Sequence, residues 1–452
     1  MDKYTSQFQL KIDEFGDLYT MKLNKNNRWV QLGSVLPWDE LVKVFSKYFS
    51  HKGRYGVNPR VVIGALIIKH KLNLSDEETV RQIQENPYMQ VFLGLDSFHA
   101  APLFSPTLFV EWRKKLGNEV FNQFSDVLIR ICHGDKIDKS NTIKNKGKLK
   151  IDATVADQDI TFPNDLKLLN EAREKTEKII DQLYKILRGQ LKVKPRTYRK
   201  LARKRYLAEA KKRQSNKKSL RMAIRYQLNC LDRNIVSIEK MADMLPQGSQ
   251  MSYKQLRTLW IIKELNRQQR QMYKTKTNRC NDRIVSISQP YVRPIVRGKV
   301  GKKVEFGAKI GLVEMEGFSK ALTLSWDAYN ESSDLIPHVE AYKELYGYYP
   351  EVVMVDKIYG TNANRKWCTE RNIRMTLHPK GKRKTLTPYE KRKRKKEHNE
   401  RNHVEAKFGQ AKRGYGLNAI RAKLNDTSKS WIGVILFVTN VIKFCEHHNF
   451  HF

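Results

Sequence analysis

The sequence is poor in the residues that hold disulfide-rich or zinc-stapled scaffolds together. It has five cysteines, and no two of them form a Cys-x-x-Cys pair. They stand far apart, at Cys132, Cys230, Cys280, Cys368 and Cys445. This spacing indicates neither a zinc ribbon nor a disulfide framework, so the thiols are interpreted as buried or inert.

Acidic residues are also in short supply. The chain has 47 Asp and Glu against 86 Lys and Arg, which gives a formal net charge of +39 and a pI of about 9.9. An excess of this size indicates an extended anionic partner, either nucleic acid or a membrane surface, and we favour nucleic acid. With 452 residues, of which 40% are hydrophobic, the chain is long enough for several domains with an ample core, which argues against a disordered polyelectrolyte.

Long apolar runs are missing as well. The opening "MDKYTSQFQLK" has no apolar signal core, and the longest late apolar stretch is "WIGVILFVTNVI", residues 431–442. That stretch is shorter than the roughly 20 residues that a helix needs to cross a bilayer. We therefore expect a cytoplasmic protein that has no membrane partner.

Residues 1–148 carry mostly helical patterns. "WDELVKVFSKYF" and "PRVVIGALIIKHKL" have apolar residues at helical spacing, and Ser75 stands three residues before Glu78, as an N-cap in a capping box does. The pattern predicts an all-α N-terminal domain. Its basic helices are candidates for DNA binding, although plain helical packing accounts for the pattern equally well.

The period of the pattern changes at Lys148. "KLKIDATVAD" alternates as a strand does, and helix then returns for more than a hundred residues. In this helical stretch, "PQGSQ" separates two helices, and the first has apolar residues at alternating steps of 3 and 4, typical of a helical hairpin or coiled coil. These residues are Leu228, Leu231, Ile235, Ile238, Ala242 and Leu245.

The segment just before that hairpin is strongly basic. "KVKPRTYRKLARKRYLAEAKKRQSNKKSLR" has Glu209 as its one acid, so one side of it is expected to face phosphate, with a merely solvated surface as the alternative. The charge favours DNA as the partner of the helical stretch. The apolar repeat favours a partner protomer or the hairpin itself, and both interpretations stay open.

Strand patterns resume at "RIVSISQP", "KKVEFGAKIGLVEME" and "KALTLSWDA", the last two as an antiparallel pair turning at Gly317. "EVVMVDKIYG" is a buried strand that ends in Asp356, and a long basic helix follows. We expect an α/β fold divided into residues 1–148 (helical domain), 149–164 (first strand of the core), 165–282 (basic helical-hairpin insertion) and 283–452 (the rest of the core).

Two carboxylates have comparable settings in these strands. Asp152 lies within a strand, and Asp356 lies at the carboxyl end of another, where open α/β sheets place their sites. Burying one carboxylate beside another costs several kcal/mol unless a cation neutralises the pair. Mg²⁺ or Mn²⁺ is the usual solution with oxygen ligands, so the pattern predicts a metal site.

The long basic helix supplies a third acid. Arg401, Glu405, Phe408 and Lys412 stand at i, i+4, i+7 and i+11, which makes one stripe with an acid for metal and bases for phosphate. The competing interpretation is an ordinary Arg401–Glu405 pair within the helix, worth about 0.3–0.5 kcal/mol. Among the other acidic residues, Glu331 is interpreted as a helix cap or a surface group.

Several motifs together resemble a known family. They are "PYMQVFLGL", "FSPTLFVEWRKKL", "KIDATVADQDITFPNDLKLLNEARE", "VEFGAK", "WDAYNES", "VVMVDKIYGTNANR" and "RNHVEAKFGQAKRGYGL", and they span nearly the whole chain. In this order they resemble the DDE transposases of bacterial insertion sequences of the IS4/IS5 type. The resemblance implies an RNase H-like mixed-sheet catalytic core interrupted by the helical insertion and preceded by the all-α domain.

The resemblance also implies roles for particular residues. It implies that Asp152, Asp356 and Glu405 are catalytic and bind two divalent ions, and that Arg401 and Lys412 contact DNA phosphate. The family signature has a tyrosine where this chain has His398, which can likewise donate a hydrogen bond to phosphate.

The function expected on these grounds is that of a DNA transposase. It would bind the inverted-repeat ends of its element, hydrolyse phosphodiester bonds with two metal ions and transfer the 3′-hydroxyl to target DNA. Because two ends must be brought together, a homodimer is expected. The alternatives are an RNase H-like nuclease without strand transfer, and a non-catalytic DNA-binding protein derived from a transposase, in which a broken triad would be expected.

Overall fold

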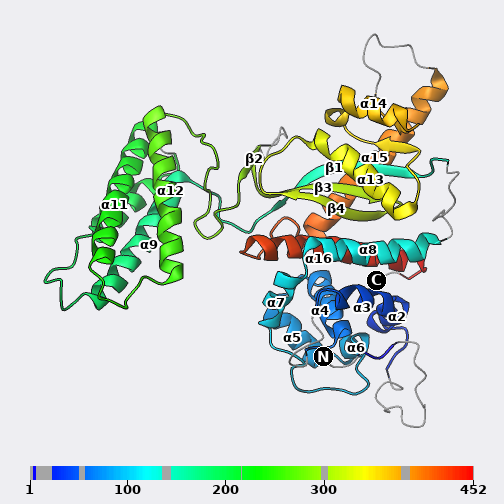
Figure 1. Ribbon diagram of the computed structural model, residues 1–452, viewed down its shortest axis with the longest axis horizontal. Coiled ribbons are helices and arrows are strands. Elements are labelled where there is room, and N and C mark those ends of the chain that lie inside the picture. The colour runs from blue at the N-terminus through cyan, green and yellow to red at the C-terminus, as the bar shows by residue number, and fades with distance from the viewer. Residues whose placement is uncertain are drawn as a thin grey trace. The chain divides into compact units, whose positions relative to one another are not determined.

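The computed structural model describes residues 4–6, 23–49, 56–134, 144–214, 216–296, 304–377 and 387–450. Contacts divide the chain into two units. The first, the sheet unit, comprises residues 1–159 and 308–452, and the second, the helical unit, comprises residues 160–307 (Figure 1). The helical unit is wider than the segment 165–282 marked in the sequence, and a separate N-terminal domain stays a prediction.

The N-terminal part of the sheet unit is helical, as expected. Asn58 accepts a hydrogen bond from the backbone N–H of Arg60 and Pro59 takes the first helical position, while Ser75 accepts from the N–H of Glu78. The helices are α2 (Arg28–Val35), α3 (Trp38–Ser46), α4 (Pro59–Lys71), α5 (Asp76–Glu85), α6 (Pro87–Phe92), α7 (Leu108–Lys115) and α8 (Asn118–His133).

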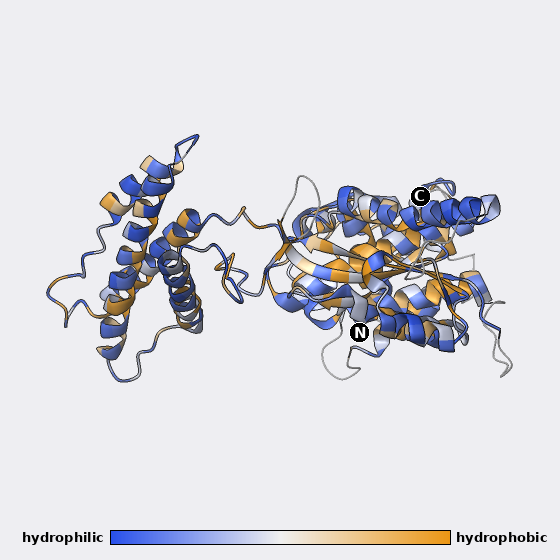
Figure 2. Ribbon diagram, turned by 90° about the horizontal axis from the view of Figure 1, so that it is seen from above, coloured by the Kyte–Doolittle hydropathy of each residue, from blue (hydrophilic) through white to orange (hydrophobic). Residues whose placement is uncertain are grey.

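A mixed sheet forms the centre of the sheet unit. Its strand order is β3-β1-β5-β6, with β4 on the other side of β3. β3 and β4 are antiparallel and turn at Gly317, whose φ of +95° suits glycine, whereas β1, β5 and β6 run parallel. The strands are β1 (Lys148–Asp157), β3 (Val304–Met315), β4 (Phe318–Ser325), β5 (Val352–Met354) and β6 (Arg374–Met375). Figure 2 shows these strands as largely apolar between helices with hydrophilic outer surfaces.

The strand predicted at "RIVSISQP" is wrong, because residues 283–290 contain no strand. Ile284 and Ile287 instead pack into the core of the helical unit, and the N–H of Ile284 donates to the side-chain oxygen of Gln268 at 2.9 Å. A side-chain amide thus replaces a strand partner. The short strand β2 (Pro294–Val296) follows and pairs antiparallel with the first residues of β3.

The apolar run at residues 431–442 belongs to a longer helix, α16 (Asn425–His447). By length and composition this helix could cross a membrane, but 89% of its most apolar window is buried inside the protein. It lies beside α8, between the sheet and the N-terminal helices (Figure 1). The ring centroid of Phe437 is 5.3 Å from that of Phe124, an aromatic contact typical of a core.

Further helices cover the sheet. The capping box of Thr387 and Glu390 starts α15 (Pro388–Gly414), which packs against β1 and holds it through a 2.6 Å ion pair between Lys148 and Glu400. The other elements are α13 (Leu335–Tyr346), α14 (Asn362–Glu370) and the 3-10 turns η3 (Glu331–Asp334) and η4 (Lys357–Tyr359).

The helical unit has a core of its own. It comprises α9 (Asp165–Ile186), α10 (Arg199–Ala210), α11 (Lys217–Asp243) and α12 (Tyr253–Thr275). The apolar repeat lies on α11, where Leu228, Leu231 and Ile238 are fully buried in one cluster with residues of α9 and α12. The repeat therefore serves the unit's own packing.

Candidate active site

The two strand carboxylates lie on neighbouring strands. β1 and β5 pair in parallel with one constant register, whose last position sets Lys150 opposite Met354. Asp152 lies two residues beyond the last paired residue of β1, and Asp356 lies two residues beyond the last residue of β5. Asp356 has just left its strand and caps η4, where its Oδ1 accepts from the N–H of Lys357 at 2.7 Å. The two acids thus follow neighbouring parallel strands at the same edge of the sheet.

Electrostatic interactions connect Asp152 to the distant helix α15. Burial raises the pKa of Asp152, the N–H of Ala153 and the charge of Arg401 oppose that rise, and the charges of Glu331 and Glu405 add to it. Arg401 and Glu405 therefore lie within electrostatic reach of Asp152, although about 250 residues separate them in sequence. The carboxylate favours a proton or a bound cation.

The sequence left open an ordinary ion pair between Arg401 and Glu405 within the helix. That pair is present, but its two charged groups are far apart. Nη2 of Arg401 is 3.8 Å from Oε1 of Glu405, too long for a hydrogen bond. The side chain of Arg401 is 18% exposed and that of Glu405 is 60% exposed. The Glu405 carboxylate therefore keeps most of its surface available for another ligand.

A basic pocket adjoins Asp356. It has a volume of about 640 Å³ and also contains His398 and Arg401 of α15. The pocket contains two acids, Asp356 and Glu397. Glu397 forms an ion pair of 2.5 Å with Arg374 of β6. The other cations that line the pocket are Lys357, Arg365, Lys391, Arg394 and Lys395. Such a lining beside carboxylates suits a phosphate backbone.

Lys412 stands apart from this cluster. It lies seven residues beyond Glu405 on α15, which is about 10 Å along the helix axis at 1.5 Å per residue. Its side chain is half-buried. The structure thus places Arg401 and Glu405 within electrostatic reach of Asp152, puts Asp356, His398 and Arg401 in one pocket, and leaves Lys412 farther along the same helix.

From the sequence, Glu331 was interpreted as a helix cap or a surface group. In the structure Glu331 is neither the cap of its turn nor an exposed residue. Asn330 caps η3, accepting from the N–H of Ser332 at 3.1 Å. Glu331 is 20% exposed, pairs with Lys309 of β3 at 2.9 Å and acts electrostatically on Asp152. The sequence could not reveal this fourth acid, because η3 and β1 are brought together only by the fold.

Tyr359 is a second residue that the sequence did not single out. It is fully buried, and its hydroxyl has no hydrogen-bond partner among the described residues. Burial, with the charges of Glu331, Asp152 and Asp334, raises its pKa above the ordinary range. The one feature of the sequence that pointed to Tyr359 was its position three residues after Asp356.

The chemistry of the three candidate carboxylates suits hard divalent cations. Asp152, Asp356 and Glu405 offer only oxygen ligands, which Mg²⁺ and Mn²⁺ prefer. Their oxygens are more widely spaced than the 4.8 Å cluster of ligand atoms that the described residues form elsewhere. The compact cluster is made by Cys132, His447 and His448 at the ends of α8 and α16.

Comparisons with known proteins agree with the motifs. Residues 17–115 match the family model described as "Transposase domain (DUF772)", and residues 353–442 match the one described as "Transposase DDE domain". "Uncharacterized protein ORF8 in nfe locus" of Rhizobium meliloti is 29% identical over 163 residues, which are 36% of this chain and 77% of that protein. No solved structure matches. The second match contains Asp356 and Glu405, whereas Asp152 lies outside both.

Proposed function

We propose, from the premise that this chain belongs to the DDE transposases of insertion sequences, that it cuts DNA at its element's ends and joins the freed 3′-hydroxyl to target DNA. The observation that carries the proposal is the position of Arg401, which lies within electrostatic reach of Asp152 with Glu405 and also lines the cationic pocket of Asp356. An acidic centre within a basic surface suits a reaction on a polyanion.

We further propose that the sheet is an RNase H-like core. The support is its topology, in which an antiparallel pair, β3 and β4, continues into the parallel strands β1, β5 and β6. Asp152 lies on β1, and Asp356 follows the adjacent strand β5, the two strands at the centre of the sheet. The helical unit enters the chain between β1 and β3, where we place the insertion.

Asp152, Asp356 and Glu405 would hold two Mg²⁺ or Mn²⁺ ions. When bound, such ions supply a deprotonated water or 3′-hydroxyl as nucleophile and stabilise the leaving oxygen of an in-line displacement. Arg401, close to Asp152 and in the pocket of Asp356, would hold the phosphate at the cleavage point. His398, from the same pocket, would donate a hydrogen bond to a neighbouring phosphate, and Lys412 would bind the backbone farther along α15.

The partners proposed are double-stranded DNA, as element ends and as target, and a second copy of the chain that brings the two ends together. We assign end recognition to the N-terminal helices, because they include the matched transposase domain. The proposed compartment is the cytoplasm, where the DNA of a bacterium lies.

The test is a cutting and joining reaction. Purified protein with Mg²⁺ is incubated with labelled DNA that carries the regions flanking its gene and with a target plasmid, and Glu405→Gln is the control. Discrete cuts and joined products that the control lacks are the expected result. Cuts without joining, under conditions that permit pairing of the ends, would favour a nuclease, and salt-sensitive binding without cuts would favour a DNA-binding relic.

A further inference from the structure

Most of the chain's net positive charge lies in the helical unit. Residues 160–307 contain 37 Lys and Arg against 12 Asp and Glu, so they hold +25 of the total of +39. The apolar repeat of α11 is buried inside the unit and is not free to bind a partner helix. The unit's surface is rich in cations. The positions of its acids determine which of these cations are neutralised and which can bind an anion.

The helix α10 is a surface helix that packs on α11, where Gln227 donates to the carbonyl of Ala202 at 3.1 Å, and whose two ends are held by acids. Of its twelve residues, only Ala202 and Glu209 are buried. At its start, Arg199 donates two hydrogen bonds to Asp181 of α9, at 2.6 and 3.0 Å. At its end, Glu209 accepts from Ser219 at 2.9 Å and from Lys212 at 2.6 Å. Both acids within reach are therefore used as anchors.

The cations in the middle of α10 are left without compensation. Lys200, Arg203 and Lys204 are exposed, and none of them forms an ion pair or side-chain hydrogen bond with any residue that the structure describes. They stand at i, i+3 and i+4, on one face of the helix. Lys211 continues the same face three turns beyond Lys200.

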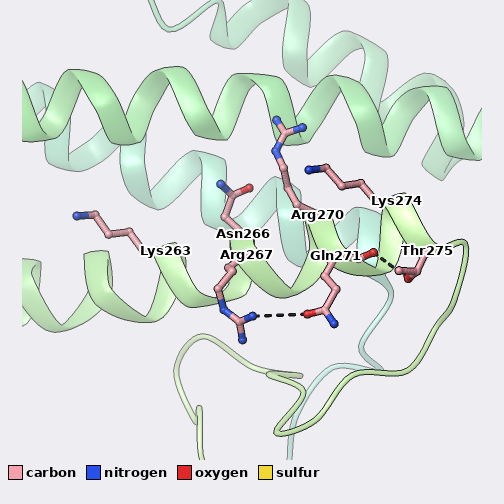
Figure 3. Close-up of a pocket in the computed structure, with 7 residues that line it drawn as sticks. All are labelled: Lys263, Asn266, Arg267, Arg270, Gln271, Lys274 and Thr275. Carbon is pink, nitrogen blue, oxygen red and sulfur yellow. Dashed lines mark hydrogen bonds between the residues drawn. The ribbon is translucent and has the colours of Figure 1, made fainter.

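The basic face of α12 differs in this respect. Figure 3 shows Lys263, Arg267, Arg270 and Lys274 around an open depression of about 490 Å³. Three of these four cations are paired with acids: Arg267 bonds Glu264 at 2.7 and 2.8 Å, while Lys263 pairs with Glu239 and Arg270 with Asp232. This face is nearly neutral, although its cations are as numerous as those of α10.

We propose that the outward face of α10, formed by Lys200, Arg203, Lys204 and Lys211, binds the phosphate backbone of double-stranded DNA, and that the cationic face of α12 does not. This inference rests on the proposed function, because the α10 face would bind the same DNA that the candidate active site cuts. Twelve helical residues span about 18 Å, the length of roughly five base pairs, so the face can reach several phosphates. Contacts of this kind hold DNA regardless of its sequence.

The test compares two variants with equal losses of charge in the full-length chain. Lys200→Gln/Arg203→Gln/Lys204→Gln changes α10, and Lys263→Gln/Arg267→Gln/Arg270→Gln, which removes the three acid-paired cations of α12, is the matched control. Binding to element-end DNA and to scrambled DNA is measured without metal over a series of salt concentrations. The α10 variant should reduce the slope of log K against log salt by about 2.7, at 0.9 per phosphate, on both DNAs, and the α12 variant by less than 1.

Equal losses in the two variants, or an unchanged slope in the α10 variant, would overturn the inference. So would a changed oligomeric mass of the α10 variant with unchanged DNA binding, because α10 would then contact a protein. If the α10 variant does not fold, lysine labelling of the wild-type protein decides: DNA should protect Lys200 and Lys204 but not Lys263 of α12, which is paired with Glu239.

The outcome is separate from that of the cutting reaction. A chain that shows the α10 effect but never cuts DNA would retain this inference and lose the proposed function. A chain that cuts and joins DNA with no α10 effect would do the reverse.

Discussion

Replacing Asp152 with asparagine should preserve the stability of the metal-free protein but weaken its binding of metal. The change keeps the oxygen that accepts the N–H of Ala153 at 2.8 Å and removes a charge that faces Glu331 and Glu405. Burial raises the pKa of Asp152, so its ionisation destabilises the folded state. That penalty is absent below the carboxyl's unfolded pKa, grows as pH rises toward the folded pKa, and is complete only above the folded pKa.

The size of the effect follows from this shift. Each unit by which the folded pKa exceeds the unfolded one costs about 1.4 kcal/mol at neutral pH. Each kcal/mol moves the melting temperature of a unit this large by about 2–4 °C. Without metal at pH 7.5, Asp152→Asn should therefore melt at the wild-type temperature or a few degrees above it, and the difference should vanish in acid.

Metal reverses the order of the two proteins. An ion at 100 times its dissociation constant stabilises the folded state by about 2.7 kcal/mol. Mn²⁺ should raise the melting temperature of the wild-type protein and have much less effect on Asp152→Asn. Asp159→Asn, at an exposed position just after the same strand, is the control and should respond as the wild type does. A metal-free Asp152→Asn protein that melts lower, or that keeps the full Mn²⁺ response, would refute the reasoning.

Three further outcomes are expected. Lys412→Ala should reduce the salt slope of DNA binding by about 0.9, and an unchanged slope would mean that Lys412 contacts no phosphate. Tyr359→Phe removes a buried hydroxyl that has no partner among the described residues, so thermal melting should show stability equal to the wild type or about 1 kcal/mol higher; a clear loss would reveal a hidden partner. Phe437→Ala should cost about 3–5 kcal/mol in urea unfolding, and a cost below 1 kcal/mol would contradict its place in the core.

Elements with strong local signals could be predicted from the sequence. The alternation of β1, the turn at Gly317 and the cap at Ser75 each depend on neighbouring residues, and all three are present in the fold. The strand predicted at residues 283–290 failed because a long-range contact, the amide of Gln268 with the backbone of Ile284, decides that segment.

The candidate site divides along the same line. Asp152 and Asp356 could be placed from their strands, and Glu405 from its helix and the family resemblance. Glu331 could not, because its closeness to Asp152 depends on the path of η3 over the sheet and its pairing with Lys309. Lys412 shares the helical stripe of Glu405, but shared periodicity does not bring two residues two turns apart to one point.

The place of the helical unit in the chain bears on how the protein is made. β1 and β3 are neighbours in the sheet, yet about 150 residues of the helical unit are synthesised between them. That unit has its own core and can fold before β3 leaves the ribosome, since domains generally fold as units during synthesis. The strand β1, which carries Asp152, can pair only after β3 and β5 have been synthesised. A chain interrupted in translation would therefore carry the basic helices without a complete acidic centre, and would occupy DNA without the means to cut it.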